Sequence, residues 1–139
     1  MILRAARLFD RVVVAVLEND SKAPAFTAAE REELLRACAA DPRIEVVRGG
    51  GLTAELARRV GASAIVRGAR DTQDFAAEAR MAELNRRLCG IDTILLPARP
   101  EFVCVSSTAI REIASRGGDI TGMVPEIIRT AIERRFAPK

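Results

Sequence analysis

Short apolar runs alternate with helical patterns along the whole chain, and this alternation constrains the fold more than any other feature. The first run, residues 11–18 (RVVVAVLE), is rich in β-branched residues and apolar almost throughout, as in a strand buried on both faces. Further strands are predicted at residues 43–48, 62–67 and 92–97. Strand–helix alternation with short connections predicts an α/β protein with a parallel sheet flanked by helices. The length of 139 residues, without a linker or repeat, indicates a single domain.

Amphipathic helices fill the intervals between these strands. Thr27 and Glu30 form the capping-box pattern Thr-Ala-Ala-Glu, which predicts a helix that continues to about residue 40. Further helices are predicted at residues 52–60, 71–88, 106–116 and 125–136, and loops at 19–26, 49–51 and 99–105.

The chain opens on a helical pattern, residues 1–10, where a fold of this class usually opens on a strand. In doubly wound sheets the first strand lies in the middle, and the turn after it binds phosphate. Without that strand, its neighbours keep unpaired edges, at about 1–3 kcal/mol per unsatisfied buried group. We therefore predict a Rossmann-like sheet whose first central strand is missing from residues 1–139, a domain incomplete at its N-terminal end, unless the sheet closes in another way.

The composition restricts both the cellular compartment that is expected and the kinds of catalytic group that the chain can supply. The chain has no histidine and three widely spaced cysteines, which argues against a zinc site and for a reducing compartment. A net charge of +3 does not indicate nucleic acid as a partner. The longest apolar run, residues 12–17, is too short to span a bilayer. We expect a cytoplasmic protein whose chemistry relies on carboxylates, amines or electrostatics.

Basic residues follow two of the predicted strands. Arg67 and Arg70 flank Gly68 and Ala69 at the carboxyl end of the third strand, where open α/β sheets bind ligands. Two guanidinium groups there can grip phosphate oxygens, although a plain helix-entry turn has the same pattern. Lys22 follows the first strand, either as a point charge for a phosphate or as an exposed loop lysine.

Hydroxyl and carboxylate groups are placed at two helices near the same edge. Ser106, Ser107 and Thr108 begin the helix that follows the fourth strand, as anion ligands or as an ordinary N-cap. Asp74 and Glu78 lie four residues apart on one helix face. They would hold the arginines, contact a ribose, or simply be solvated.

Seven ordered segments add a resemblance over nearly the whole chain. They are RAARLFD-x-VVVAV (4–16), S-K-x-P-x-F-T-x-x-E-R (21–31), G-L-T (51–53), V-R-G-A-R-D-x-x-D-F-x-x-E (66–78), M-A-x-L-N-R-R-L (81–88), V-S-S-T-A-I-R-E (105–112) and G-D-I-T-G-M-V-P (118–125). In this order they resemble the bacterial phosphopantetheine adenylyltransferases of the nucleotidyltransferase superfamily. The resemblance implies transfer of the adenylyl group of ATP to 4′-phosphopantetheine, with magnesium, to give dephospho-coenzyme A and pyrophosphate. It also implies a homo-hexamer.

The resemblance assigns roles to residues of this chain. Lys22 and Arg67 would contact the phosphate of phosphopantetheine, and Thr53 would lie near the pantetheine arm. Lys22 and Arg70 would serve catalysis by neutralising charge. The implied ATP contacts are Gly68, Ala69, Arg70, Glu78, Phe102, Val103, Cys104, Val105, Ser106, Ser107 and Thr108.

One departure from the family pattern leaves other functions open. The family begins with a strand and a P-G-T/S-F-D-P-x-T-x-G-H segment, and this chain contains neither that segment nor any histidine. The first alternative is a truncated or silent relative that binds coenzyme A or a nucleotide without turnover. A nicotinamide-mononucleotide type of nucleotidyltransferase fits the context of Lys22 less well. A nucleic-acid-binding domain rests only on the arginine content and predicts affinity that falls steeply with salt.

Overall fold

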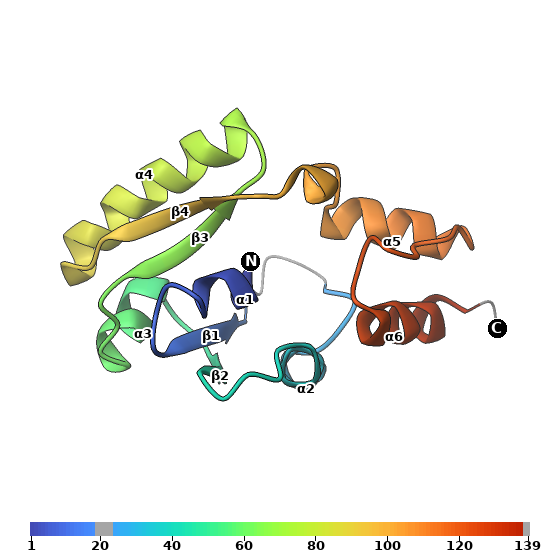
Figure 1. Ribbon diagram of the computed structural model, residues 1–139, viewed down its shortest axis with the longest axis horizontal. Coiled ribbons are helices and arrows are strands. Elements are labelled where there is room, and N and C mark those ends of the chain that lie inside the picture. The colour runs from blue at the N-terminus through green and yellow to red at the C-terminus, as the bar shows by residue number, and fades with distance from the viewer. Residues whose placement is uncertain (19–23, 138–139) are drawn as a thin grey trace.

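The computed structural model describes residues 1–18 and 24–137, and helices and strands alternate through it as the sequence predicts (Figure 1). The four strands are parallel and helices flank them, so the predicted α/β class is confirmed. The elements are α1 (Ile2–Ala5), β1 (Val12–Leu17), α2 (Ala28–Cys38), β2 (Ile44–Gly49), α3 (Thr53–Arg59), β3 (Ile65–Ala69), α4 (Thr72–Cys89), β4 (Thr93–Pro97), the 3₁₀ turn η1 (Pro100–Phe102), α5 (Ser107–Ser115) and α6 (Glu126–Phe136).

The strands form two parallel pairs rather than one continuous sheet. β1 pairs with β2 from Val12 opposite Ile44 to Leu17 opposite Gly49. β3 pairs with β4 in the same sense, from Ile65 opposite Thr93 to Ala69 opposite Pro97. Within the described residues β1 and β3 share no ladder, and Figure 1 shows the two pairs apart with α1 beside them. The described residues therefore contain two separate two-stranded sheets, and the missing central strand stays a prediction.

The predicted first helix, residues 1–10, is too long. α1 ends at Ala5, and the next hydrogen bonds run from Arg7 N to Arg4 O and from Leu8 N to Ala5 O. These bonds span three residues and form a tight turn that ends the helix. Phe9 N still donates to Ala5 O, and the chain then extends to Val12, where β1 begins.

The third strand lies further along the chain than predicted. β3 continues through Arg67 and Gly68 to Ala69, because the ladder with β4 is maintained to Pro97. Ala69 O also accepts a hydrogen bond from Ala98 N at 2.8 Å. Arg67, Gly68 and Ala69 therefore belong to the strand, and only Arg70 follows it.

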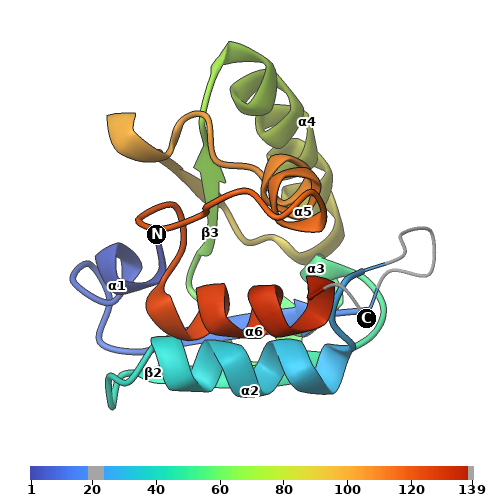
Figure 2. The same cartoon turned by 90° about the vertical axis from the view of Figure 1, so that its right-hand side faces the viewer.

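A buried core lies among the C-terminal helices. Ile110, Ala114, Ile120 and Ile132 form one buried cluster, and Ile120 is only 1% exposed. α6 runs beside α2 (Figure 2), and Arg135 joins them through an ion pair with Glu30. The predicted capping box at the start of α2 is confirmed. In the part of the chain that the structure describes, no helix is long and apolar enough to cross a membrane.

Candidate functional site

Arg67 projects from β3 and is held by the next helix. Its Nε and Nη2 donate to the two carboxylate oxygens of Glu78 at 2.8 and 2.7 Å, a bidentate pair. The hydrogen bonds to Glu78 raise the pKa of Arg67. The guanidinium is charged and fixed in direction, yet half of the side chain is exposed.

Arg70 follows β3 directly and joins three segments of the chain. Its Nε donates to Asp74 Oδ2 at 2.7 Å, and its Nη1 donates to the carbonyl of Val105 at 3.4 Å. Asp74 itself lies in the first turn of α4, and its backbone N donates to the capping carboxylate of Asp71. The hydrogen bond from Arg70 keeps the pKa of Asp74 below its ordinary value. Of the options for Asp74 and Glu78, the one in which they hold the arginines is confirmed.

The serines before α5 have two different positions. Ser106 is the N-cap, and its hydroxyl accepts a hydrogen bond from Ala109 N at 3.1 Å. Ser107 and Thr108 occupy the first two helical positions and are exposed. The three residues before Val105 are exposed as well; they are Phe102, Val103 and Cys104. Through Val105 this segment lies against Arg70, so the structure joins two regions that are far apart in sequence.

The N-terminal segment reaches the same edge, which the sequence did not indicate. Met1 lies over Gly68, where an added Cβ would come within 2.7 Å of Met1 Sδ. Arg4 Nη1 donates to the carbonyl of Pro97 at 2.6 Å, across 93 residues. Burial, followed by the charges of Arg4 and Arg99, lowers the pKa of the Met1 amino group. Cations thus gather at the carboxyl ends of β3 and β4, and only the packing of α1 on the sheet reveals it.

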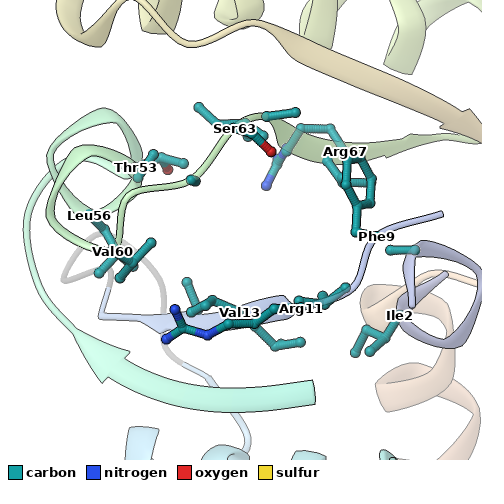
Figure 3. Close-up of a pocket in the computed structure, with 18 of the residues that line it drawn as sticks. Ile2, Phe9, Arg11, Val13, Thr53, Leu56, Val60, Ser63 and Arg67 are labelled. Carbon is teal, nitrogen blue, oxygen red and sulfur yellow. The ribbon is translucent and has the colours of Figure 1, made fainter. Parts of the chain in front are cut away.

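A cavity of about 550 Å³ lies between the two strand pairs. Figure 3 shows Thr53, Leu56 and Val60 on one side of it and Ile2 and Phe9 on another. Thr53 and Arg67 both line this cavity, so the structure brings together two of the residues predicted to bind the acceptor. Lys22, the third, lies outside the described residues.

Comparison with known proteins agrees with this geometry. The profile of the family described as cytidylyltransferase-like matches residues 1–113. A phosphopantetheine adenylyltransferase of Gloeobacter violaceus is 45% identical over 139 residues, which cover 99% of this chain and 86% of that protein. The chain belongs to the phosphopantetheine adenylyltransferase family. Members from Cutibacterium acnes and Frankia casuarinae are 42% and 37% identical, over 98% and 99% of this chain and 87% and 88% of their own lengths. The predicted family membership is confirmed.

The magnesium that the family resemblance implies has no ready-made protein site here. Among residues 1–18 and 24–137, no three His, Cys, Asp or Glu side chains are grouped as metal ligands. Asp74 and Glu78, the carboxylates nearest the two arginines, are each committed to one of them. A metal held by protein side chains alone therefore does not fit the described residues.

Proposed function

We propose that this protein transfers the adenylyl group of ATP to 4′-phosphopantetheine, forming dephospho-coenzyme A and pyrophosphate in the cytoplasm. The observation that carries the proposal is the 37–45% identity to phosphopantetheine adenylyltransferases over nearly the whole chain. The cations at the carboxyl ends of β3 and β4 support it, because both substrates are phosphate esters.

Arg67 and Thr53 are proposed to bind the acceptor, with Lys22. A guanidinium has five N–H donors, and the pair with Glu78 occupies only Nε and Nη2 of Arg67. Nη1 is then directed to a phosphate oxygen while Glu78 keeps the group in place. Thr53 begins α3 at the wall of the same cavity, beside which the pantetheine arm would lie.

ATP is proposed to bind across Arg70 and the start of α5. Gly68 and Ala69 are proposed contacts at the strand end, which ATP reaches once the Met1 side chain over Gly68 moves aside, and Glu78 is a further proposed contact. The remaining ATP contacts are Phe102, Val103, Cys104, Val105, Ser106, Ser107 and Thr108. Ser106 Oγ accepts a hydrogen bond from Ala109 N, and its O–H remains available to donate to a phosphate oxygen. Exposed Ser107 and Thr108 supply hydroxyl donors at a helix N-terminus.

Catalysis on this arrangement consists of positioning and charge neutralisation. Lys22 and Arg70 would offset the negative charge that develops on the phosphates, and no covalent intermediate is required. Magnesium enters as the complex with ATP, held by phosphate oxygens and water. Metal held in this way is part of the substrate rather than a resident cofactor.

The acceptor panel tests this function. The protein is incubated with Mg-ATP and either 4′-phosphopantetheine or nicotinamide mononucleotide, and products are identified by mass spectrometry. Dephospho-coenzyme A from the first acceptor alone is the expected product. A dinucleotide from the second acceptor would instead make the protein the other type of nucleotidyltransferase. Adding DNA at several salt concentrations tests whether the protein is a nucleic-acid-binding domain. We expect the DNA not to compete with ATP.

A second candidate is a relative that binds coenzyme A or a nucleotide without turnover. The interrupted sheet favours it, together with the absence of histidine from the sequence. Binding of ATP without product in the acceptor panel would support this candidate.

We also propose assembly into a homo-hexamer. The outer face of α4 carries large apolar side chains that are about half exposed, which is typical of a surface covered by another subunit. They are Met81, Leu84 and Leu88.

A further inference from the structure

Asp74 holds both the side chain and the backbone of Arg70 with one carboxylate. Arg70 Nε donates to Asp74 Oδ2 at 2.7 Å, and Arg70 Nη2 donates to Asp74 Oδ1 at 3.3 Å. The backbone N of Arg70 donates to the same Oδ2 at 3.3 Å. A planar guanidinium that is bound along one edge in this way cannot turn without losing both side-chain hydrogen bonds.

The start of α4 holds Asp74 in its turn. The backbone N of Asp74 donates to Oδ1 of Asp71, the N-cap of the helix, at 2.8 Å. Asp74 lies in the first turn of α4, where the helix dipole favours a negative charge. The backbone that carries this carboxylate is therefore fixed independently of its bonds to Arg70.

The pair with Asp74 leaves a defined part of Arg70 for a ligand. A guanidinium has five N–H donors. Asp74 accepts from two of them, and the carbonyl of Val105 accepts from a third, on Nη1. Among the contacts of the described residues, one N–H on Nη1 and one on Nη2 are therefore left unused. The Arg70 side chain is 38% exposed, so a ligand can approach these two donors from solvent.

The bond from Arg70 to Val105 places this guanidinium next to a helix start. Val105 directly precedes Ser106, the N-cap of α5, and the exposed residues Ser107 and Thr108 follow. Arg70 thus lies beside the helix N-terminus at which the phosphates of ATP are proposed to bind. A guanidinium that turned away from Asp74 would also lose this position.

We propose that Asp74 is a positioning residue for ATP, which directs the two unused N–H groups of Arg70 at the phosphates. The inference rests on the proposed binding of ATP at Arg70. Asp74 acts through Arg70 rather than by touching the nucleotide, because both of its carboxylate oxygens already accept from Arg70. If Asp74 acted only through its charge, its carboxylate would repel the triphosphate, and its removal would strengthen ATP binding. The two roles therefore predict changes of opposite sign.

Isothermal titration with Mg-ATP distinguishes these two roles. Asp74→Asn replaces one acceptor oxygen by an amide group that only donates, so the two side-chain bonds to Arg70 cannot both form. We expect the Kd for Mg-ATP to rise about threefold to tenfold, the effect of one lost hydrogen bond. Asp74→Glu keeps a carboxylate four residues from Arg70 and should restore most of the affinity. Glu83→Gln is the matched control, because it removes the same charge from a carboxylate that pairs with Arg86 and Arg87 in the same helix, and it should leave the Kd unchanged.

A double-mutant cycle with Arg70→Ala separates positioning from any other role of Asp74. If Asp74 acts only through Arg70, Asp74→Asn should weaken ATP binding no further once Arg70 is alanine. An equal loss in both backgrounds, or unchanged or tighter binding by Asp74→Asn alone, would overturn the inference. Failure of the unsubstituted protein to bind Mg-ATP would overturn both this inference and the proposed function. ATP binding with the expected cycle but without product would support the inference and contradict adenylyl transfer.

Discussion

Each arginine at the end of β3 is paired with a carboxylate of the helix that follows. Arg67 is paired with Glu78, and Arg70 with Asp74. These pairs are exposed, so their contribution to stability is small, but they hold two long side chains in defined directions. At the residue scale the site is thus an arrangement of charge fixed before any phosphate arrives.

Replacement of Arg70 by alanine should reduce ATP affinity by about tenfold to a hundredfold, the range for a lost hydrogen bond to a charged group. The change also separates β3 from Val105, since the guanidinium bonds to that carbonyl. Isothermal titration with Mg-ATP measures the affinity. Arg87→Ala is the matched control, because Arg87 pairs with Glu83 in another part of α4. Unchanged ATP affinity in Arg70→Ala would refute the proposed role.

Asp41 makes stability depend on pH. Its side chain accepts hydrogen bonds from Arg43 N, Nε and Nη2, and these bonds lower the pKa of Asp41 to about 2. Because the folded pKa lies below the unfolded value, the stabilisation is present above about pH 4 and is lost as the pH falls toward 2. Asp41→Asn should therefore lower the urea midpoint at pH 7, and its difference from the unsubstituted protein should shrink between pH 4 and pH 2. A difference that stays constant over that interval would contradict this origin.

At the scale of elements, the start of α5 places the capping hydroxyl of Ser106 beside the hydroxyl of Ser107, which is proposed to bind ATP. Ser106 caps the helix, so Ser106→Ala should cost about 1 kcal/mol of unfolding free energy. Ser107 is exposed at the first helical position, so Ser107→Ala should leave stability unchanged and weaken ATP binding. Urea unfolding and ATP titration of both variants measure the two effects. Equal loss of stability in the two variants would show that the assignment of the cap is wrong.

Sequence patterns predicted the type and order of the helices and strands more accurately than the residues at which they end. The capping box located the start of α2, because that signal consists of local hydrogen bonds. The end of β3 was missed, since it depends on the ladder with β4 rather than on residues 62–67 themselves. Arg4 and Pro97 are 93 positions apart, so no local sequence pattern predicts the hydrogen bond between them. The proximity of Arg67, Arg70 and Glu78 could be predicted, because a strand end and the following helix keep them close together.

At the scale of the whole molecule, the main feature is that the four strands form two separate parallel pairs. In the described residues β1 and β3 share no ladder, while the missing central strand itself stays a prediction from topology. The relatives also extend beyond the part that this chain matches, since the match covers 86–88% of their length. The edge proposed to bind the phosphates is formed by the β3–β4 pair, and the hydrogen bond from Arg4 to Pro97 joins α1 to it.

Assembly can be tested on the apolar face of α4. Leu84 is 50% exposed, so Leu84→Glu should place a charge in the proposed subunit contact without disturbing the core. Light scattering after gel filtration should give a hexamer for the unsubstituted protein and a smaller species for the variant. Thr72→Glu adds the same charge to an exposed position on another side of the same helix and should leave the mass unchanged. If Leu84→Glu still forms a hexamer, the subunit interface lies on a surface other than this face of α4.

Pyrophosphate release tests the central claim most directly. This protein is given Mg-ATP with and without 4′-phosphopantetheine, and pyrophosphate is followed over time. We predict pyrophosphate release that requires the acceptor and is slow. The histidine of the family's G-H segment is absent from this sequence, and the loss of one pre-positioned electrostatic group costs about 10²–10³ in rate. Release that ignores the acceptor, or none at all while ATP still binds, would contradict adenylyl transfer by this chain.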